Sequence, residues 1–315
     1  MGGVVDSRLF VAAVLTSVFF GSGCGYRGGG GGGDDDDGAR RPAEAPDFVV
    51  VGVSGHCFGF SCPSEDYSPE YLEAGGSLEA IATAIAADGG SVTFEAYGDS
   101  FWSYPAEDGW TPGVRGFLEL VEDLNWIYDN WMAGFENPTI PIVVAHSHGT
   151  VWAHTALHLL DYVPVLLLVD LDGESLGWES DTWTLDTIGD DWAFVAEDFY
   201  YENVDDWPLS VDWHFDIWDA ANAWDIPGVA GLQDIEDVVP WNVGVNIETA
   251  STDSVIQDGE PNHRLDGSQD HIYRFEAVYD GHGEVDDLGS ETMDWLLEVL
   301  DEIAWDEVIE SFEDQ

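Results

Sequence analysis

The sequence predicts an α/β fold, in which a mainly parallel sheet of about six strands carries helices on both faces. Short apolar runs, several rich in β-branched residues, alternate with longer segments whose apolar residues recur at helical spacing. Strands that are covered on both faces are expected to be almost wholly apolar, as these runs are. Repeated strand, helix, strand units of this kind favour parallel strands joined by helical crossovers.

Strands and helices alternate in the first half of the predicted domain, which begins at residue 47. The strands are expected at 48–54, 91–97, 140–145 and 163–171, the last of these being the most apolar. Helices are expected from Ser77 to about residue 87 and over 117–131, where apolar residues recur at helical spacing. A further helix is expected over 149–160, after the third strand. Ser77 can cap its helix, and Gly89 and Gly90 end it.

The second half repeats the alternation after an interruption. Strands are expected at 243–248 and 271–278, and a closing helix at 290–303. Residues 175–240 break the pattern and hold seven of the 15 Trp, so we interpret them as an insertion into a single domain spanning 47–315.

The charge balance is extreme. The 315 residues include 64 acidic and only 7 basic side chains, all Arg, for a formal net charge of -57. Almost nothing could displace the counterions of a nucleic acid, so no nucleic-acid partner is expected. Such a surface repels itself unless salt screens it, which indicates an acidic protein of a saline, halophilic setting. With 45% hydrophobic residues the chain can still form a core.

The N-terminus has the features of an export signal. Arg8 precedes an apolar run over 9–20, which is too short to span a bilayer and ends in Gly21-Ser22-Gly23-Cys24. This arrangement resembles a bacterial lipoprotein signal peptide. The resemblance implies cleavage after residue 23, lipidation (palmitate) of Cys24 and an outer-membrane or other cell-envelope location; simple cleavage and secretion is the alternative. The Gly- and Asp-rich stretch 24–46 is then a flexible tether.

Two further cysteines, Cys57 and Cys62, lie close together in the sequence. In an exported protein an oxidising compartment favours a disulfide between them, and two free thiols are the alternative.

The motif with the clearest chemistry is Ala145-His146-Ser147-His148-Gly149. A Ser flanked at two positions on each side by small residues, between a buried strand and a helix, is typical of a nucleophile elbow. Here the sequence resembles the α/β-hydrolase superfamily, specifically lipases and esterases, with Ala145 in place of the usual first Gly. The resemblance implies Ser147 as nucleophile and a backbone N–H of His148 in the oxyanion hole.

The resemblance also implies a base and an acid. The superfamily places its His between the last strand and the closing helix, where His282 lies. Asp172, at the end of a strand, is the favoured acid, and Asp253 is the alternative. Asp170, by the alternation of side chains along a strand, is expected to face the other side of the sheet, which indicates a structural role.

The remaining parts of such a site come from two other segments. The loop after the first strand offers a second oxyanion donor, the N–H of His56 or alternatively of Cys57, and a bridge from Cys57 to Cys62 would hold that loop rigid. The 175–240 insertion lies where such hydrolases carry a cap. Its aromatic residues either line the site or bury the insertion's own helices.

A metal site is the competing interpretation of the motif. His146, His148, His154 and His158 lie within thirteen residues, but the acidic ligand that a His-based hydrolase motif contains is absent from it. No metal and no cofactor are therefore expected.

The sequence therefore predicts an exported, lipid-anchored serine hydrolase that cleaves carboxylic esters. Its partners would be a small-molecule or lipid ester and, through the anchor, a membrane. A thioesterase, amidase or peptidase would use the same triad, and an inactive binding module would keep only the fold.

Overall fold

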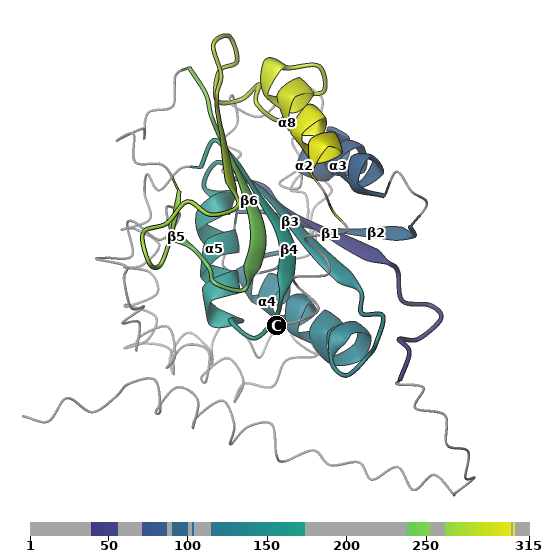
Figure 1. The fold of residues 1–315 in the computed structure, drawn as a ribbon. Coiled ribbons are helices and arrows are strands. Elements are labelled where there is room, and N and C mark those ends of the chain that lie inside the picture. Colours follow the sequence, from purple (N-terminus) through teal and green to yellow (C-terminus); the bar gives the residue numbers. More distant parts are fainter. Residues whose placement is uncertain are drawn as a thin grey trace, which may run out of the picture. The chain divides into compact units, whose positions relative to one another are not determined.

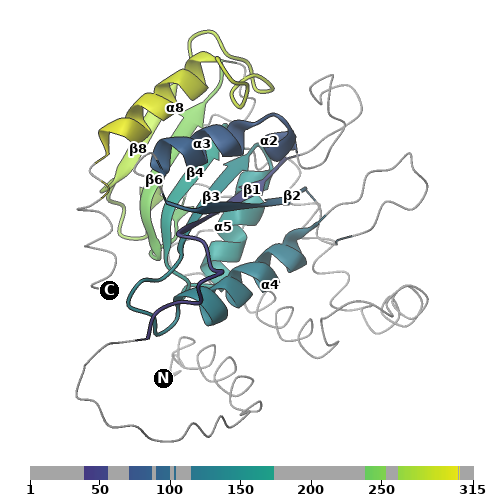
Figure 2. The same ribbon diagram turned by 90° about the vertical axis from the view of Figure 1, so that its right-hand side faces the viewer.

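Six parallel strands form the central sheet in the order β2-β1-β3-β4-β6-β8 (Figure 1, with β8 labelled in Figure 2). In the computed structural model the strands are β1 Phe48–Val53, β2 Val92–Tyr97, β3 Ile140–His146, β4 Val165–Leu171, β6 Val243–Ala250 and β8 Ile272–Glu276. Each neighbouring pair in this sheet is parallel. The predicted α/β class with a six-stranded parallel sheet is confirmed.

The structure describes residues 39–55, 71–86, 90–99, 103, 115–173, 238–252, 262–303 and 305, which all belong to one compact unit. The predicted signal peptide, Cys24 and most of the tether lie outside these residues, as does nearly all of the 175–240 insertion. Within the described ranges, no helix has the length and apolar character that crossing a membrane requires.

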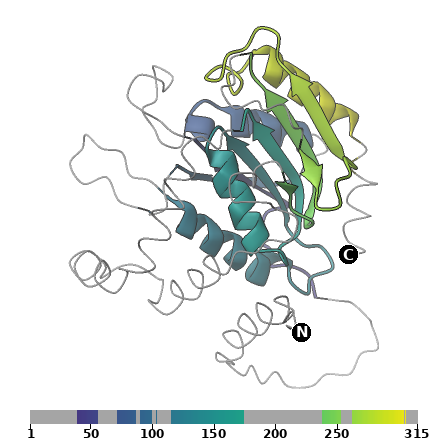
Figure 3. The ribbon, with the colours of Figure 1, turned by 90° about the vertical axis from the view of Figure 1, so that its left-hand side faces the viewer.

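Helices cover both faces of the sheet, as Figures 2 and 3 show from opposite sides. One face carries α2 (Tyr71–Ala74), α3 (Ser77–Ile85) and α8 (Glu291–Glu302), and the other carries α4 (Phe117–Ile127) and α5 (Gly149–Leu159). A π-helical turn, η1 (Tyr128–Met132), continues α4. The predicted cap of α3 is wrong: Gly76 occupies the N-cap position, and the Ser77 hydroxyl donates instead to the backbone carbonyl of Asp286 at 2.5 Å.

The core follows from strand alternation. On β4, Leu167, Val169 and Leu171 face the α3 and α8 side and pack in one cluster with residues of both helices. The residues between them face the opposite side, so Asp170 points towards α5, where its carboxylate meets His154. A small parallel pair, β5 (Val238–Val239) with β7 (His263–Arg264), was not predicted.

The carboxyl ends of the central strands meet at one edge of the sheet. The pairing of β1 with β3 and of β3 with β4 is parallel, which brings the residues after each strand together at that edge. In open parallel sheets, sites form at this edge, beside the point where the strand order reverses. Gly55, Ser147 and Asp172 all lie there.

Candidate active site

Ser147 lies in a tight turn between β3 and α5. Its φ of 56° is left-handed, a conformation that a residue with a side chain rarely adopts, and its N–H donates to the Leu171 carbonyl at 3.0 Å. The turn forces close approach to the end of β1: a Cβ at Gly149 would lie 2.2 Å from the Val53 carbonyl oxygen. A Cβ at Gly55 would lie 2.5 Å from that of Ser147. Both positions therefore require Gly.

The imidazole of His282 lies between a hydroxyl and a carboxylate. Its Nε2 is 2.8 Å from the Ser147 Oγ, and its Nδ1 is 2.5 Å from the Asp172 Oδ2. A carboxylate only accepts, so Nδ1 carries the proton and Nε2 is free to accept one from the Ser147 hydroxyl. The structure thus brings together three residues that lie far apart in the sequence.

Asp172 is held for this contact by the end of β6. It follows the last residue of β4 with a φ of 46°, which takes its side chain out of the strand alternation. Its Oδ1 accepts from the Ser251 N–H at 2.9 Å, and its own N–H donates to the Thr249 carbonyl at 3.0 Å. Burial alone would raise the pKa of Asp172, but the hydrogen bonds from His282 and Ser251 outweigh it and lower the pKa. The carboxylate therefore stays charged beside His282.

His148, the predicted oxyanion donor, occupies the N-cap position of α5. There its backbone N–H belongs to the first turn, at the positive end of the helix dipole. Its side chain contacts Asp99: Nδ1 is 2.9 Å from the Asp99 Oδ1, which also accepts from the Trp152 indole at 2.6 Å. The other predicted positions, His56, Cys57, Cys62 and Asp253, lie outside the described residues.

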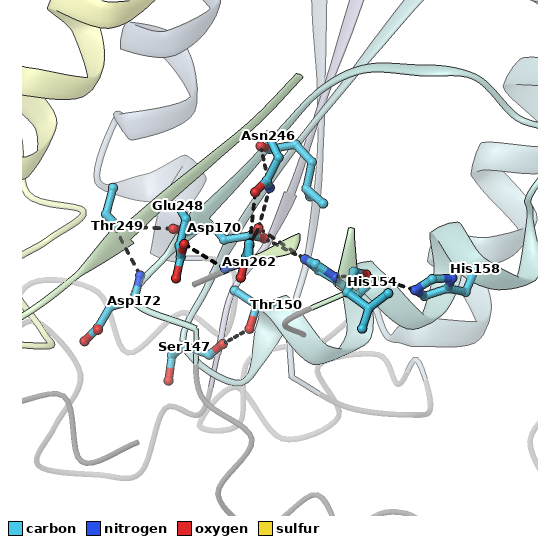
Figure 4. A network of polar contacts seen from close by, with 12 residues as sticks. Ser147, Thr150, His154, His158, Asp170, Asp172, Asn246, Glu248, Thr249 and Asn262 are labelled. Carbon is cyan, nitrogen blue, oxygen red and sulfur yellow. Dashed lines mark hydrogen bonds and ion pairs between the residues drawn. The ribbon is translucent and has the colours of Figure 1, made fainter. Parts of the chain in front are cut away.

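Behind the Ser147 turn lies a second buried polar cluster, centred on Asp170 (Figure 4). The Asp170 carboxylate lies 3.1 Å from the His154 Nε2 and accepts from the amides of Asn246 at 2.6 Å and Asn262 at 2.9 Å. The other His154 nitrogen, Nδ1, faces the Val238 carbonyl at 3.2 Å. Both ring nitrogens therefore face acceptors, and His154 and Asp170 form a buried pair of imidazole and carboxyl group.

These contacts also account for the two His residues of the α5 face. His154 pairs with Asp170, and His158 donates from Nε2 to the Val238 carbonyl at 3.1 Å. In the part of the chain that the structure describes, no three His, Cys, Asp or Glu side chains are grouped to hold a metal ion.

The motif analysis missed residues that contact the site. Ser251 and Thr249 fix Asp172, and His146 touches His282 from within the motif itself. A backbone donor such as Ser251 leaves no side-chain signal in a sequence. His146 was visible only as an apparent metal ligand, because its partners come from distant segments.

Comparisons with known proteins give only a distant likeness. No family model and no curated protein matches the chain. Among solved structures it resembles the Pyrococcus furiosus esterase Pf2001, at 13% identity over 81% of each chain with a TM-score of 0.40. It also resembles a hormone-sensitive lipase from a metagenome library, at 10% identity over 95% of this chain and 98% of that chain with a TM-score of 0.41. A third similar structure is Est1E from Butyrivibrio proteoclasticus, at 12% identity over 86% of this chain and 93% of that chain with a TM-score of 0.36. At scores this low, the fold and the site stand on the strand order and contacts described above.

Proposed function

We propose that this protein is a serine hydrolase of the lipase and esterase type, which cleaves carboxylic esters through Ser147, His282 and Asp172. The observation that carries the proposal is the continuous contact from hydroxyl to imidazole to carboxylate, 2.8 Å and 2.5 Å long, at the carboxyl edge of the sheet. This is the arrangement that activates a hydroxyl, which alone is a weak nucleophile.

In the proposed reaction, the Ser147 Oγ attacks the ester carbonyl carbon while the His282 Nε2 takes its proton. Asp172 holds the imidazole in the required tautomer and stabilises its positive charge. The His148 N–H and a donor from the loop after β1, His56 or Cys57, would bind the oxyanion. His282 then protonates the departing alcohol, and a water activated in the same way releases the acid from Ser147.

Hydrolysis of p-nitrophenyl esters of increasing acyl length tests this proposal. We expect the wild type to release p-nitrophenol and Ser147→Ala to lose that activity, with an unchanged melting temperature. A matched thioester and anilide separate the thioesterase, amidase and peptidase alternatives. An inactive wild type that folds normally would favour the binding module.

We further propose that the enzyme is exported and anchored through Cys24, on the strength of the N-terminal sequence. Labelling with a palmitate analogue in a bacterial host should mark the wild type, and Cys24→Ala should remove the label. A labelled Cys24→Ala protein, or an unlabelled wild type, would contradict the anchor without touching the hydrolase proposal.

A further inference from the structure

His146, the residue before the nucleophile, contacts the catalytic base directly. Its side chain is buried, and its Nε2 lies 2.9 Å from the backbone carbonyl oxygen of His282. The two imidazoles are stacked, with ring centroids 5.0 Å apart and planes 29° apart. One side chain therefore touches both the backbone and the ring of His282.

The partners of His146 determine where its proton lies. The His282 carbonyl only accepts, so Nε2 must carry a hydrogen. Burial lowers the pKa of His146, and this outweighs the nearby carboxylates of Asp286 and Asp172, which raise it. The ring is therefore neutral, and its Nδ1 is an acceptor.

Tyr71 of α2 supplies the donor for that nitrogen. Its hydroxyl hydrogen-bonds the His146 Nδ1 and also accepts from the Gly55 N–H at 2.9 Å. Burial raises the pKa of Tyr71, so the hydroxyl keeps its proton. A single set of donors and acceptors thus runs from the Gly55 N–H through Tyr71 and His146 to the His282 carbonyl.

We infer that Tyr71 and His146 are positioning residues for the proposed reaction, which hold His282 at the distance from Ser147 that proton transfer needs. The inference depends on the proposed function. Its physical basis is that His146 and Ser147 are adjacent in the chain, so the rigid end of β3 fixes the nucleophile and, through His146, the loop that carries the base. Tyr71 and Gly55 tie the same unit to the end of β1.

The neutrality of His146 matters for the reaction as well. His282 becomes positively charged when it takes the Ser147 proton. A neutral ring stacked on it tolerates that charge, whereas a protonated one at 5.0 Å would repel it. In the neutral ring the Tyr71 hydroxyl donates to Nδ1, a hydrogen bond that protonation of that nitrogen would remove.

Kinetics of four variants test the inference. Tyr71→Phe and His146→Leu should each lower kcat by about 10- to 100-fold, the cost of a misplaced catalytic group, and leave KM within about twofold. His146→Gln, which can keep an N–H donor near the Nε2 position, should recover part of the loss. The matched control is Tyr97→Phe. Tyr97 lies in β2 and is also buried, but its hydroxyl donates a hydrogen bond to Asp123 of α4 at 2.6 Å. This variant should keep the wild-type kcat.

A second readout does not require turnover. The low-field proton resonance of the His282 Nδ1–H, which faces Asp172, should shift or broaden in Tyr71→Phe and stay unchanged in Tyr97→Phe. Wild-type kcat and an unmoved resonance in both Tyr71→Phe and His146→Leu would overturn the inference. If His146→Leu does not fold, Tyr71→Phe and His146→Gln decide. A wild type that cleaves no ester would instead contradict the proposed function, while the resonance would still report on positioning.

Discussion

Asp170 and Asp172 lie two positions apart at the end of β4, yet among the described residues their carboxylates share no hydrogen-bond partner. Asp170 accepts from Asn246 and Asn262 and pairs with His154, all on the α5 side. Asp172 accepts from the Ser251 N–H and contacts His282. The difference arises because Asp170 follows the strand alternation, whereas Asp172 has a φ of 46°.

The first prediction is that Asn substitution of Asp172 lowers activity, whereas Asn substitution of Asp170 lowers stability. Asp172→Asn should lower kcat by about 10⁴-fold with little loss of stability, because an amide no longer fixes the tautomer of His282. Asp170→Asn should lower the free energy of unfolding by about 3 to 5 kcal/mol, because it leaves His154 without its carboxylate in the core. Ester hydrolysis and urea unfolding measure the two effects.

Asp253→Asn is the matched control for the first prediction, since Asp253 is the alternative acid in the sequence. Its kcat should stay close to that of the wild type. A large loss of kcat in Asp253→Asn, with little loss in Asp172→Asn, would make Asp253 the acid.

The second prediction concerns the tight turn at Ser147. Gly149→Ala should reduce soluble yield or melting temperature and abolish activity, because its Cβ would overlap the Val53 carbonyl. Gly283→Ala is the control, since a Cβ at that position would meet no described atom within 4 Å. Circular-dichroism melts compare the two. Equal stability of both variants would contradict the packing described for the elbow.

The third prediction is a pH dependence of stability caused by His158. Burial, with repulsion from His154, lowers the pKa of His158 to about 4. Between an unfolded value of about 6.5 and that pKa, the unfolded chain binds a proton that the folded chain does not, so stability falls as the pH falls. This group contributes at most about 1.4 kcal/mol per pH unit.

His158→Gln isolates that contribution, because Gln can still donate to the Val238 carbonyl but does not titrate. Urea unfolding at several pH values from about 7 to about 4.5 should show the variant gaining stability relative to the wild type as the pH falls. A difference between the two proteins that does not change with pH would contradict a depressed pKa. Groups that do not interact with His158, such as His146, titrate alike in both proteins and cancel in the comparison.

The fourth prediction concerns salt. With a formal net charge of -57, repulsion is stronger in the folded protein than in the expanded chain, and salt screens it. The melting temperature should rise between about 0.05 M and about 2 M NaCl. The rise should be steepest at the low-salt end of the series, where the Debye length falls fastest. A melting temperature that is flat across the series would contradict the inference of a saline setting.

Much of the fold could be predicted from the sequence because buried parallel strands and their helical crossovers leave a repeated pattern. The almost wholly apolar run that ends in Leu171 is typical of a strand covered on both faces, and it forms β4, one of the two middle strands of the sheet. Short or exposed elements left weaker signals. The four-residue α2 has too few residues for helical periodicity, although it carries Tyr71, and the β5 and β7 pair has only two residues in each strand.

Some residues of the candidate site could likewise be predicted from the sequence, and others could not. Ser147 and His282 stood out because each lies at a junction between a strand and a helix, with small neighbours. The choice between Asp172 and Asp253 stayed open because acidic residues are so common in this chain that one more carries little information. The contacts from His146 to His282 and from Ser251 to Asp172 depend on how distant loops meet, which neither periodicity nor spacing encodes.

The most direct test of the central claim is covalent labelling with a fluorophosphonate, because only a Ser activated by a base beside an oxyanion hole reacts rapidly with it. We expect the folded wild type to be labelled at one site, which mass spectrometry of the peptide locates at Ser147. Ser147→Ala should not be labelled, and Asp172→Asn should be labelled far more slowly. A wild type that remains unlabelled, or a Ser147→Ala variant labelled as fast as the wild type, would contradict the claim that this protein is a serine hydrolase.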